Sequence, residues 1–327
     1  MRTRYSLTIP PVSSPEIPPS DGSSPFLDLP DDIKRDVFFR LPLKAALALG
    51  QTNKSTLCFF REQAVALNLA KHLLTFVAQG QEAGARKILE EHPDLLFKNS
   101  QVTDCSGRHF SYISPFQYAL WVGDADMLKM MQSAIEALPK GKEQALSQMK
   151  ELETKGVSYD YTDAGGIEKQ EKASRCYNNN LLKNAYQTYL ANCKHWVETG
   201  DWIALRNCWF EKIGGAQRML PAWQRQAFCQ SYPFVPLPTD EQFGQPLERT
   251  FQLLDSSGHF PRAMRLKFMP LVPELRETWG WRVNRSRELA VTAQLDWEMY
   301  DRVCEVRAQQ VEEFKYSLGE RPQSKPA

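Results

Sequence analysis

The chain has 327 residues, of which 42% are hydrophobic and 24% charged, values typical of a globular protein with a sizeable core. Its 40 basic and 39 acidic side chains leave a formal net charge of +1, which argues against a dedicated nucleic-acid or anionic-membrane binder. No run of about 18 consecutive apolar residues is present, so we expect no membrane span. Seven irregularly spaced cysteines without Cys-x-x-Cys pairs predict reduced thiols in a cytosolic protein, with no metal and no cofactor.

The N-terminal part divides into a leader and a helical region. Residues 1–25 hold six prolines and several serines, and we expect them to be disordered because they have little to bury. From residue 26 to about residue 65 the pattern is helical. Ile33, Val37 and Leu41 recur every four residues, which places them on one face of a helix, and two more short helices are expected to follow.

The stretch Leu29-Pro30-Asp31-Asp32-Ile33, continued to Thr52-Asn53-Lys54, resembles an F-box of the kind found in bacterial effector proteins. The resemblance implies three compact helices over residues 26–65 that bind the Skp-type adaptor of cullin–RING ubiquitin ligases. The alternative is that these helices begin a larger bundle and bind no partner. The adaptor-binding residues implied by the resemblance are Leu29, Pro30, Ile33, Val37, Phe38, Leu41 and Leu47.

Residues 66–138 contain a weak internal repeat of two helix pairs, which turn at Gly80 and at Gly123. The run Ser114-Pro115-Phe116-Gln117-Tyr118-Ala119 resembles the ankyrin signature T-P-L-H-x-A, and Gly123-Asp124 matches the turn between paired helices. We therefore interpret the segment as two degenerate ankyrin-like helix pairs. The polar stretch 99–111 is expected to form an enlarged loop between them.

A helical C-terminal region is predicted over residues 139–319, followed by a tail over 320–327. Asp160 to Gly166 is expected to be an exposed loop, and strand signals are scarce throughout. A helix beginning near Asn180 should end at Gly200, with Asp201 capping the next one. The last long helix is expected to span about Arg285 to Leu318.

Two features of the C-terminal half could carry function. Cys193 and His195 are two residues apart on a helix, so they point to different faces and cannot act as a nucleophile–base pair. A thiol enzyme would need a spatial pair such as Cys229 with His259. The step Trp279-Gly280-Trp281 lies at a break between segments and is expected to be exposed, which makes Trp279 and Trp281 the candidates for binding a target protein.

The run from Ile213 to Pro221 lacks the Gly-Lys-Ser/Thr ending of a phosphate-binding loop. With the Phe228-Cys229 step after it, this run resembles a segment that follows ankyrin repeats in effectors of intracellular bacteria. The resemblance implies a cytosolic protein that a bacterium secretes into its host.

The sequence thus predicts a mostly α fold with an N-terminal three-helix F-box, two degenerate ankyrin-like helix pairs and a C-terminal helical region. The predicted function is that of a substrate receptor, which docks on a host ubiquitin ligase and recruits an unidentified target protein. Such a protein needs no catalytic residues, because the ligase acts by proximity. Two alternatives stay open: a thiol-dependent enzyme in the C-terminal half, and a helical scaffold without a ligase.

Overall fold

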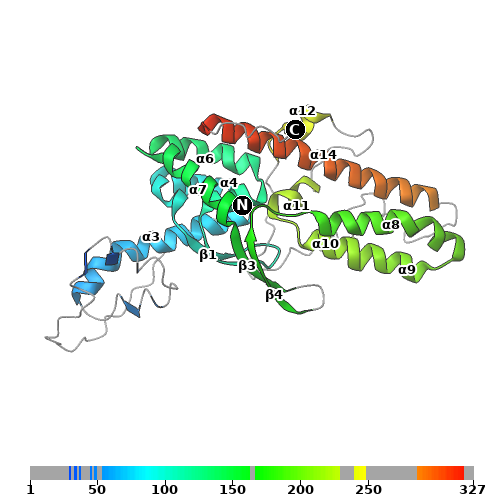
Figure 1. Ribbon diagram of the computed structural model, residues 1–327, viewed down its shortest axis with the longest axis horizontal. Helices are drawn as coiled ribbons and strands as arrows, with labels where there is room; N and C mark the ends of the chain where they lie inside the picture. The colour runs from blue at the N-terminus through cyan, green and yellow to red at the C-terminus, as the bar shows by residue number, and fades with distance from the viewer. Residues whose placement is uncertain are drawn as a thin grey trace, which may run out of the picture. The chain divides into compact units, whose positions relative to one another are not determined.

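The computed structural model describes residues 54–162, 166–228, 239–247 and 286–319, together with eight single residues between 29 and 49 (Figure 1). The chain divides into two compact units, residues 1–68 and residues 69–327, and each is considered by itself. Helix α3 (Lys54–Ala78) begins in the first unit and ends in the second. The fold is mostly helical, as predicted, but it also contains a four-stranded sheet.

The remaining helices and strands all belong to the second unit. In chain order they are α4 (Glu82–Glu91), the 3-10 helix η1 (Pro93–Phe97), β1 (Ser100–Thr103), β2 (His109–Ile113), α5 (Pro115–Val122), α6 (Ala125–Ala137), α7 (Gly141–Lys155), β3 (Val157–Thr162), β4 (Glu168–Ser174), α8 (Asn180–Thr199), α9 (Trp202–Asn207), the π-helix η2 (Cys208–Ile213), α10 (Gly214–Arg218), α11 (Ala222–Phe228), α12 (Asp240–Gly244) and α14 (Ser286–Leu318).

Three connections between helices use the same turn. Gly80, Gly123 and Gly200 have φ angles of +67°, +70° and +72°, a left-handed conformation that favours glycine. At each of them the glycine N–H donates to the carbonyl three residues back. The N–H of the next residue donates to the carbonyl five residues before it, which is the Schellman pattern that ends a helix. The predicted turns at these three glycines are therefore confirmed.

Aspartates begin the helix after two of these turns. The side chain of Asp124 accepts from the N–H of Met127 at 3.1 Å, and that of Asp201 accepts from the N–H of Ala204 at 2.9 Å. Each carboxylate satisfies a backbone donor that the first turn of a helix leaves unpaired. The predicted cap at Asp201 is confirmed.

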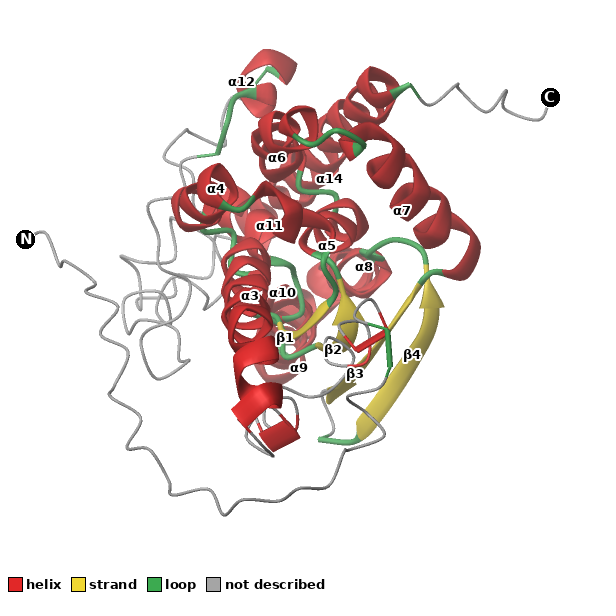
Figure 2. Ribbon diagram, turned by 90° about the vertical axis from the view of Figure 1, so that its left-hand side faces the viewer, coloured by secondary structure: helices red, strands yellow, loops and turns green. Residues whose placement is uncertain are grey.

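The sheet corrects two predictions. Its strands are antiparallel in the order β1-β2-β3-β4, and Figure 2 shows them side by side with β4 outermost. The predicted loop over 99–111 is mostly the hairpin β1–β2. Residues 160–162 of the second predicted loop belong to β3, and residues 163–165 lie outside the described residues. Pairing with a neighbouring strand, rather than burial of its own side chains, is what holds a polar strand such as β4 in place.

Each of the two hairpins follows a pair of helices joined by a glycine turn. β1–β2 follows the helices that turn at Gly80, and β3–β4 follows those that turn at Gly123, with α7 inserted before it. β2 then pairs with β3, so the hairpins join into one sheet. A helix pair followed by a hairpin therefore occurs twice in succession, and a third helix pair, α8 and α9, comes next.

Two groups of aromatic side chains form much of the core of the second unit. Phe110 of β2 contacts Tyr118, Trp121 and Tyr159, with ring centroids 5.2 to 5.5 Å apart. Further along, α8 packs against α9, η2 and α14, and Figure 1 shows these helices lying side by side. The rings between them belong to Tyr186, Tyr189, Trp209, Trp297 and Tyr300.

Across the described ranges, none of the helices combines the length and the apolar character that crossing a bilayer requires.

Candidate protein-interaction surfaces

At the start of the predicted F-box, the described residues form a helical turn with apolar side chains in contact with solvent. The N–H of Lys34 donates to the carbonyl of Pro30 at 3.0 Å, and Ile33, Lys34 and Val37 are helical. Leu29 is 37% exposed and Ile33 is 45% exposed, whereas Val37 is half-buried. The other predicted site residues lie outside the described part of the chain: Phe38, Leu41, Leu47, Trp279 and Trp281.

A cavity of about 380 Å³ opens between the sheet and the helices α5 and α7. β2 and β3 are in register at one position, where His109 faces Asp160. Beyond this pair, the cavity lies between the two strands. Ser111 and Tyr112 line it on β2, and Val157 and Ser158 line it on β3. We call it the strand-gap cavity. The side chains with functional groups around it are Tyr112, Gln117, Glu151, Lys155, Tyr159 and Asp160.

The capping box of α5 positions one wall of the strand-gap cavity. The Ser114 hydroxyl accepts from the N–H of Gln117 at 3.0 Å, and the Gln117 side chain accepts in return from the N–H of Ser114. This fixes the Gln117 amide, which donates from Nε2 to Oε2 of Glu151 at 3.2 Å. The cap that begins α5 at Ser114-Pro115 therefore also orients a carboxylate on α7.

Gly156 places β3 beside α7. Its φ is +66°, and a Cβ at this position would lie 2.3 Å from the carbonyl carbon of Ala173. Only glycine fits between the end of the helix and the neighbouring strand β4. The sequence carries a strand signal here: after Gly156, apolar or aromatic residues occur at alternate positions, at Val157, Tyr159 and Tyr161. This signal was not identified from the sequence, and the cavity beside β3 was therefore not predicted.

Arg108 is buried beneath the sheet in a box of aromatic rings. Its guanidinium carbon lies 4.9 Å from the ring centroid of Tyr177, 5.6 Å from that of Tyr159 and 6.0 Å from that of Trp121. One nitrogen donates to the carbonyl of Met219 at 2.8 Å. The box keeps this cation away from the solvent and fixes the ring of Tyr159 beside the strand-gap cavity.

A second buried arginine holds the same turn of the chain. Arg225 is 0% exposed and donates to the carbonyls of Leu220, Cys105 and Arg218. The Tyr177 hydroxyl donates to the carbonyl of Met219 at 3.1 Å. The run from Ile213 to Pro221 lacks the ending of a phosphate loop, and its role here is structural. The carbonyls at its end accept hydrogen bonds that join the first hairpin to the C-terminal helices.

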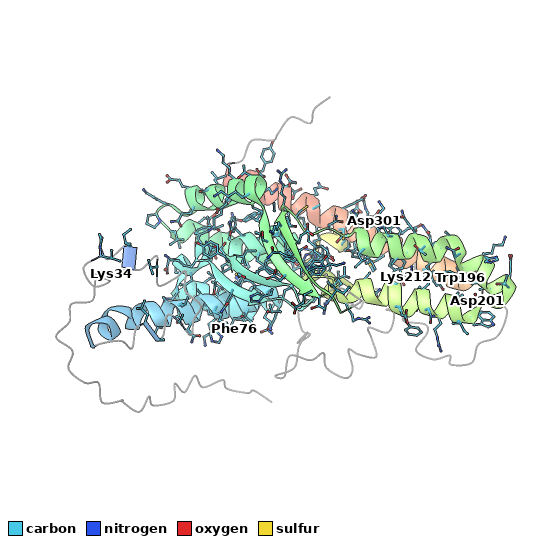
Figure 3. All side chains as sticks on the ribbon, turned by 60° about the horizontal axis from the view of Figure 1, so that its bottom comes forward. Lys34, Phe76, Trp196, Asp201, Lys212 and Asp301 are labelled. Atoms are coloured by element: carbon cyan, nitrogen blue, oxygen red, sulfur yellow. The ribbon has the colours of Figure 1, made fainter. Side chains whose placement is uncertain are left out.

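The helix formed by α9, η2 and α10 exposes three large apolar side chains. Trp202 is 42% exposed, Ile203 is 69% exposed and Phe210 is 38% exposed. Figure 3 shows the nearby Asp201 and Lys212 along this helix, with Trp196 on the adjoining α8. Among the described tryptophans, three are buried: Trp121, Trp209 and Trp223. The interruption at η2 is a π-helix of the kind that often occurs at functional sites.

Four described thiols are ill suited to nucleophilic chemistry. Burial raises the pKa of Cys105 to about 11 and that of Cys304 to about 12, and it also raises the pKa values of Cys193 and Cys208. A higher pKa lowers the fraction of thiolate, which is the reactive form. Within the described ranges, no group of histidine, cysteine or carboxylate side chains is arranged to hold a metal ion. Cys229 and His259, the pair an enzyme would need, lie outside these ranges.

Alkylation with iodoacetamide at pH 8 should follow this order. We expect the exposed Cys176 to react at least about ten-fold faster than Cys105 and Cys304, because Cys105 is buried, Cys304 is half-buried, and the raised pKa values keep both protonated. Peptide mass spectrometry on the native protein measures each rate, and labelling in urea provides the control in which the three rates converge. Fast labelling of Cys105 or Cys304 in the native protein would contradict the raised pKa values.

Comparison with known proteins finds two similarities. Residues 181–318 match the family model described as the CBUA0006 C-terminal domain, from the second residue of α8 to the last residue of α14. The chain is also 32% identical over 199 residues to the uncharacterized protein CBUA0006 of Coxiella burnetii. That alignment covers 56% of this chain and 55% of the relative, so the chain spans about half the length of the curated relative it matches. No solved structure matches the chain.

Proposed function

We propose that the chain is a substrate receptor for a host cullin–RING ubiquitin ligase. Its F-box residues bind the Skp-type adaptor, and the second unit holds the target protein. The observation that carries the proposal is the pair of exposed apolar side chains, Leu29 and Ile33, on a helical turn that begins at Pro30. A short helical segment that leaves apolar side chains in water is suited to helix-in-groove recognition by another protein.

The second unit supports the target-binding role. In it a helix pair with a left-handed glycine turn, followed by a hairpin, occurs twice, and the hairpins join in one sheet. This order fits a short stack of ankyrin-like repeats in which each unit buries its apolar face against the next. Such a stack offers a surface for a protein partner, and the ligase then modifies the bound target by proximity. By the resemblance to effectors of intracellular bacteria, we propose that this activity takes place in the cytosol of a host cell.

Binding to a purified Skp-type adaptor tests the proposal. We expect the wild-type chain to bind and the double variant Leu29→Ala/Pro30→Ala to bind at least about thirty-fold more weakly, because the loss of even one interface hot spot costs about 2 kcal/mol or more. Surface plasmon resonance with immobilised adaptor measures both dissociation constants. Far-UV circular dichroism of each variant shows whether helix content is preserved.

The matched control is Ile203→Ala, which removes an equally apolar side chain that is 69% exposed on α9. This variant should bind the adaptor as the wild type does. The proposal fails if the wild type does not bind, or if the Leu29/Pro30 variant and the control bind equally well. A chain that binds host proteins but not the adaptor would instead be a scaffold.

A further inference from the structure

The strand-gap cavity has the size of a peptide-binding site. Ligand pockets usually measure about 300–1,000 Å³, so its volume of about 380 Å³ can hold one long side chain with part of its backbone. Two of its walls are the strands β2 and β3 where they no longer pair in register. A third extended chain can bind in such a gap, because strand backbone groups that do not pair with each other can pair with it.

Two carboxylates line the cavity, one on α7 and one on β3, and give it a negative character. Glu151 on α7 accepts from the Gln117 amide at 3.2 Å, and Asp160 on β3 accepts from the Gln170 amide at 2.9 Å. These amide donors orient the carboxylates without neutralising them. Asp160 forms no ion pair with another described residue, so its negative charge is not compensated in this way within the cavity. Asp126, in contrast, is paired with Arg307.

The cation in the lining is weakly held. Lys155 lies 3.0 Å from Glu151, but its side chain is 74% exposed and that of Glu151 is 44% exposed. Exposed pairs one helical turn apart are worth little and exchange readily with another cation. Glu151, Asp160 and Lys155 together leave a net charge of −1 in the lining.

The aromatic side chains of the lining favour the same kind of occupant. Tyr112 is 56% exposed, and the ring of Tyr159 is fixed from behind by Arg108. Tyrosine faces attract arginine and lysine, and the negative charge beside them adds to this attraction.

From the gap, the charge and the rings, we infer that the strand-gap cavity binds an extended peptide segment that inserts an arginine or lysine side chain between Glu151 and Asp160. The role of this site rests on the proposed function, since the segment belongs to the recruited target. Recognition of the segment itself requires neither the adaptor nor the N-terminal unit, so the two proposals can fail independently.

Selection from a displayed library of random heptapeptides on the immobilised full chain, without adaptor, tests the inference. We expect enriched peptides with a basic residue at one fixed position. The best of them, made synthetically, should bind the variant Glu151→Gln/Asp160→Asn about ten-fold more weakly, because two charge-assisted hydrogen bonds are weakened. Thermal melting of the variant shows whether these nearly isosteric changes leave the fold intact.

Two single variants serve as controls. Glu143→Gln removes one negative charge from an exposed position in the first turn of α7, outside the cavity, and should not change binding. Lys155→Ala removes the competing cation and should keep or strengthen binding. The inference is overturned if no peptides are enriched, if those enriched share no basic position, or if Glu143→Gln weakens binding as much as the double variant does.

Discussion

Replacing Arg307 by methionine is expected to lower the free energy of unfolding by about 3–5 kcal/mol, because the carboxylate of Asp126 then stays in the core without its cation. Arg307 on α14 is 1% exposed, and its Nη1 lies 2.7 Å from Oδ1 of Asp126 on α6. The same guanidinium donates to the carbonyl of Gln245 and, at 3.1 Å, to Oε1 of Gln310.

The large effect follows from how many segments meet at this pair. The second carboxylate oxygen of Asp126 accepts from the N–H of Leu247 at 2.9 Å. One buried ion pair therefore joins three parts of the chain: α6, α14 and the short segment that follows α12. Urea unfolding followed by circular dichroism measures the change, and an unaltered m-value shows that the unfolding reaction is the same. Adding Asp126→Asn to the Arg307→Met variant removes the stranded charge and should recover part of the loss.

The pair Arg302–Asp240 provides a matched control. It also joins α14 to α12 and is bidentate, but its side chains are 48% and 60% exposed. Exposed ion pairs add little to stability, so Arg302→Met should leave the unfolding midpoint nearly unchanged. Equal losses from Arg302→Met and Arg307→Met would show that burial is not what makes the Arg307 pair important.

The parts of the fold that the sequence predicted well are those with local causes. The predicted last helix, from about residue 285 to residue 318, matches α14 within one residue at its start. The helix ends at Gly123 and Gly200 were identified because a left-handed glycine turn is fixed by the few residues around it. Capping by Asp201 is local in the same way.

The parts that were missed depend on residues far apart in the chain. β4 has only exposed or half-buried side chains, so no alternation of apolar and polar residues marks it, and it exists because β3 lies beside it. Arg108 would pass for a surface residue, but the carbonyl it binds belongs to Met219, 111 positions away. The strand-gap cavity combines α5, α7, β2 and β3, and no short motif contains its carboxylates.

Two helical glycines, Gly141 and Gly215, have opposite surroundings. Gly141 is the buried first residue of α7, and a Cβ there would lie 1.9 Å from the carbonyl oxygen of Ile135. Gly215 is in α10, where the nearest atom to an added Cβ is a side-chain nitrogen of Arg218 at 3.8 Å. Gly141→Ala should therefore destabilise the protein by about 3 kcal/mol, because a backbone carbonyl must move. Gly215→Ala should stabilise it by about 0.5–1 kcal/mol, because alanine loses less backbone entropy in a helix.

Both variants add a single methyl group to a helical glycine, so differential scanning calorimetry compares them under identical conditions. A fall in the melting temperature for Gly141→Ala and a rise for Gly215→Ala is the expected outcome. Equal shifts would mean that α7 does not begin against Ile135 as described. Since α7 carries Glu151, a displaced α7 should also weaken peptide binding in the strand-gap cavity, whereas Gly215→Ala should leave that binding intact. The glycine at the start of α7 thus links the stability of the second unit to the position of the carboxylate that we expect to bind the target.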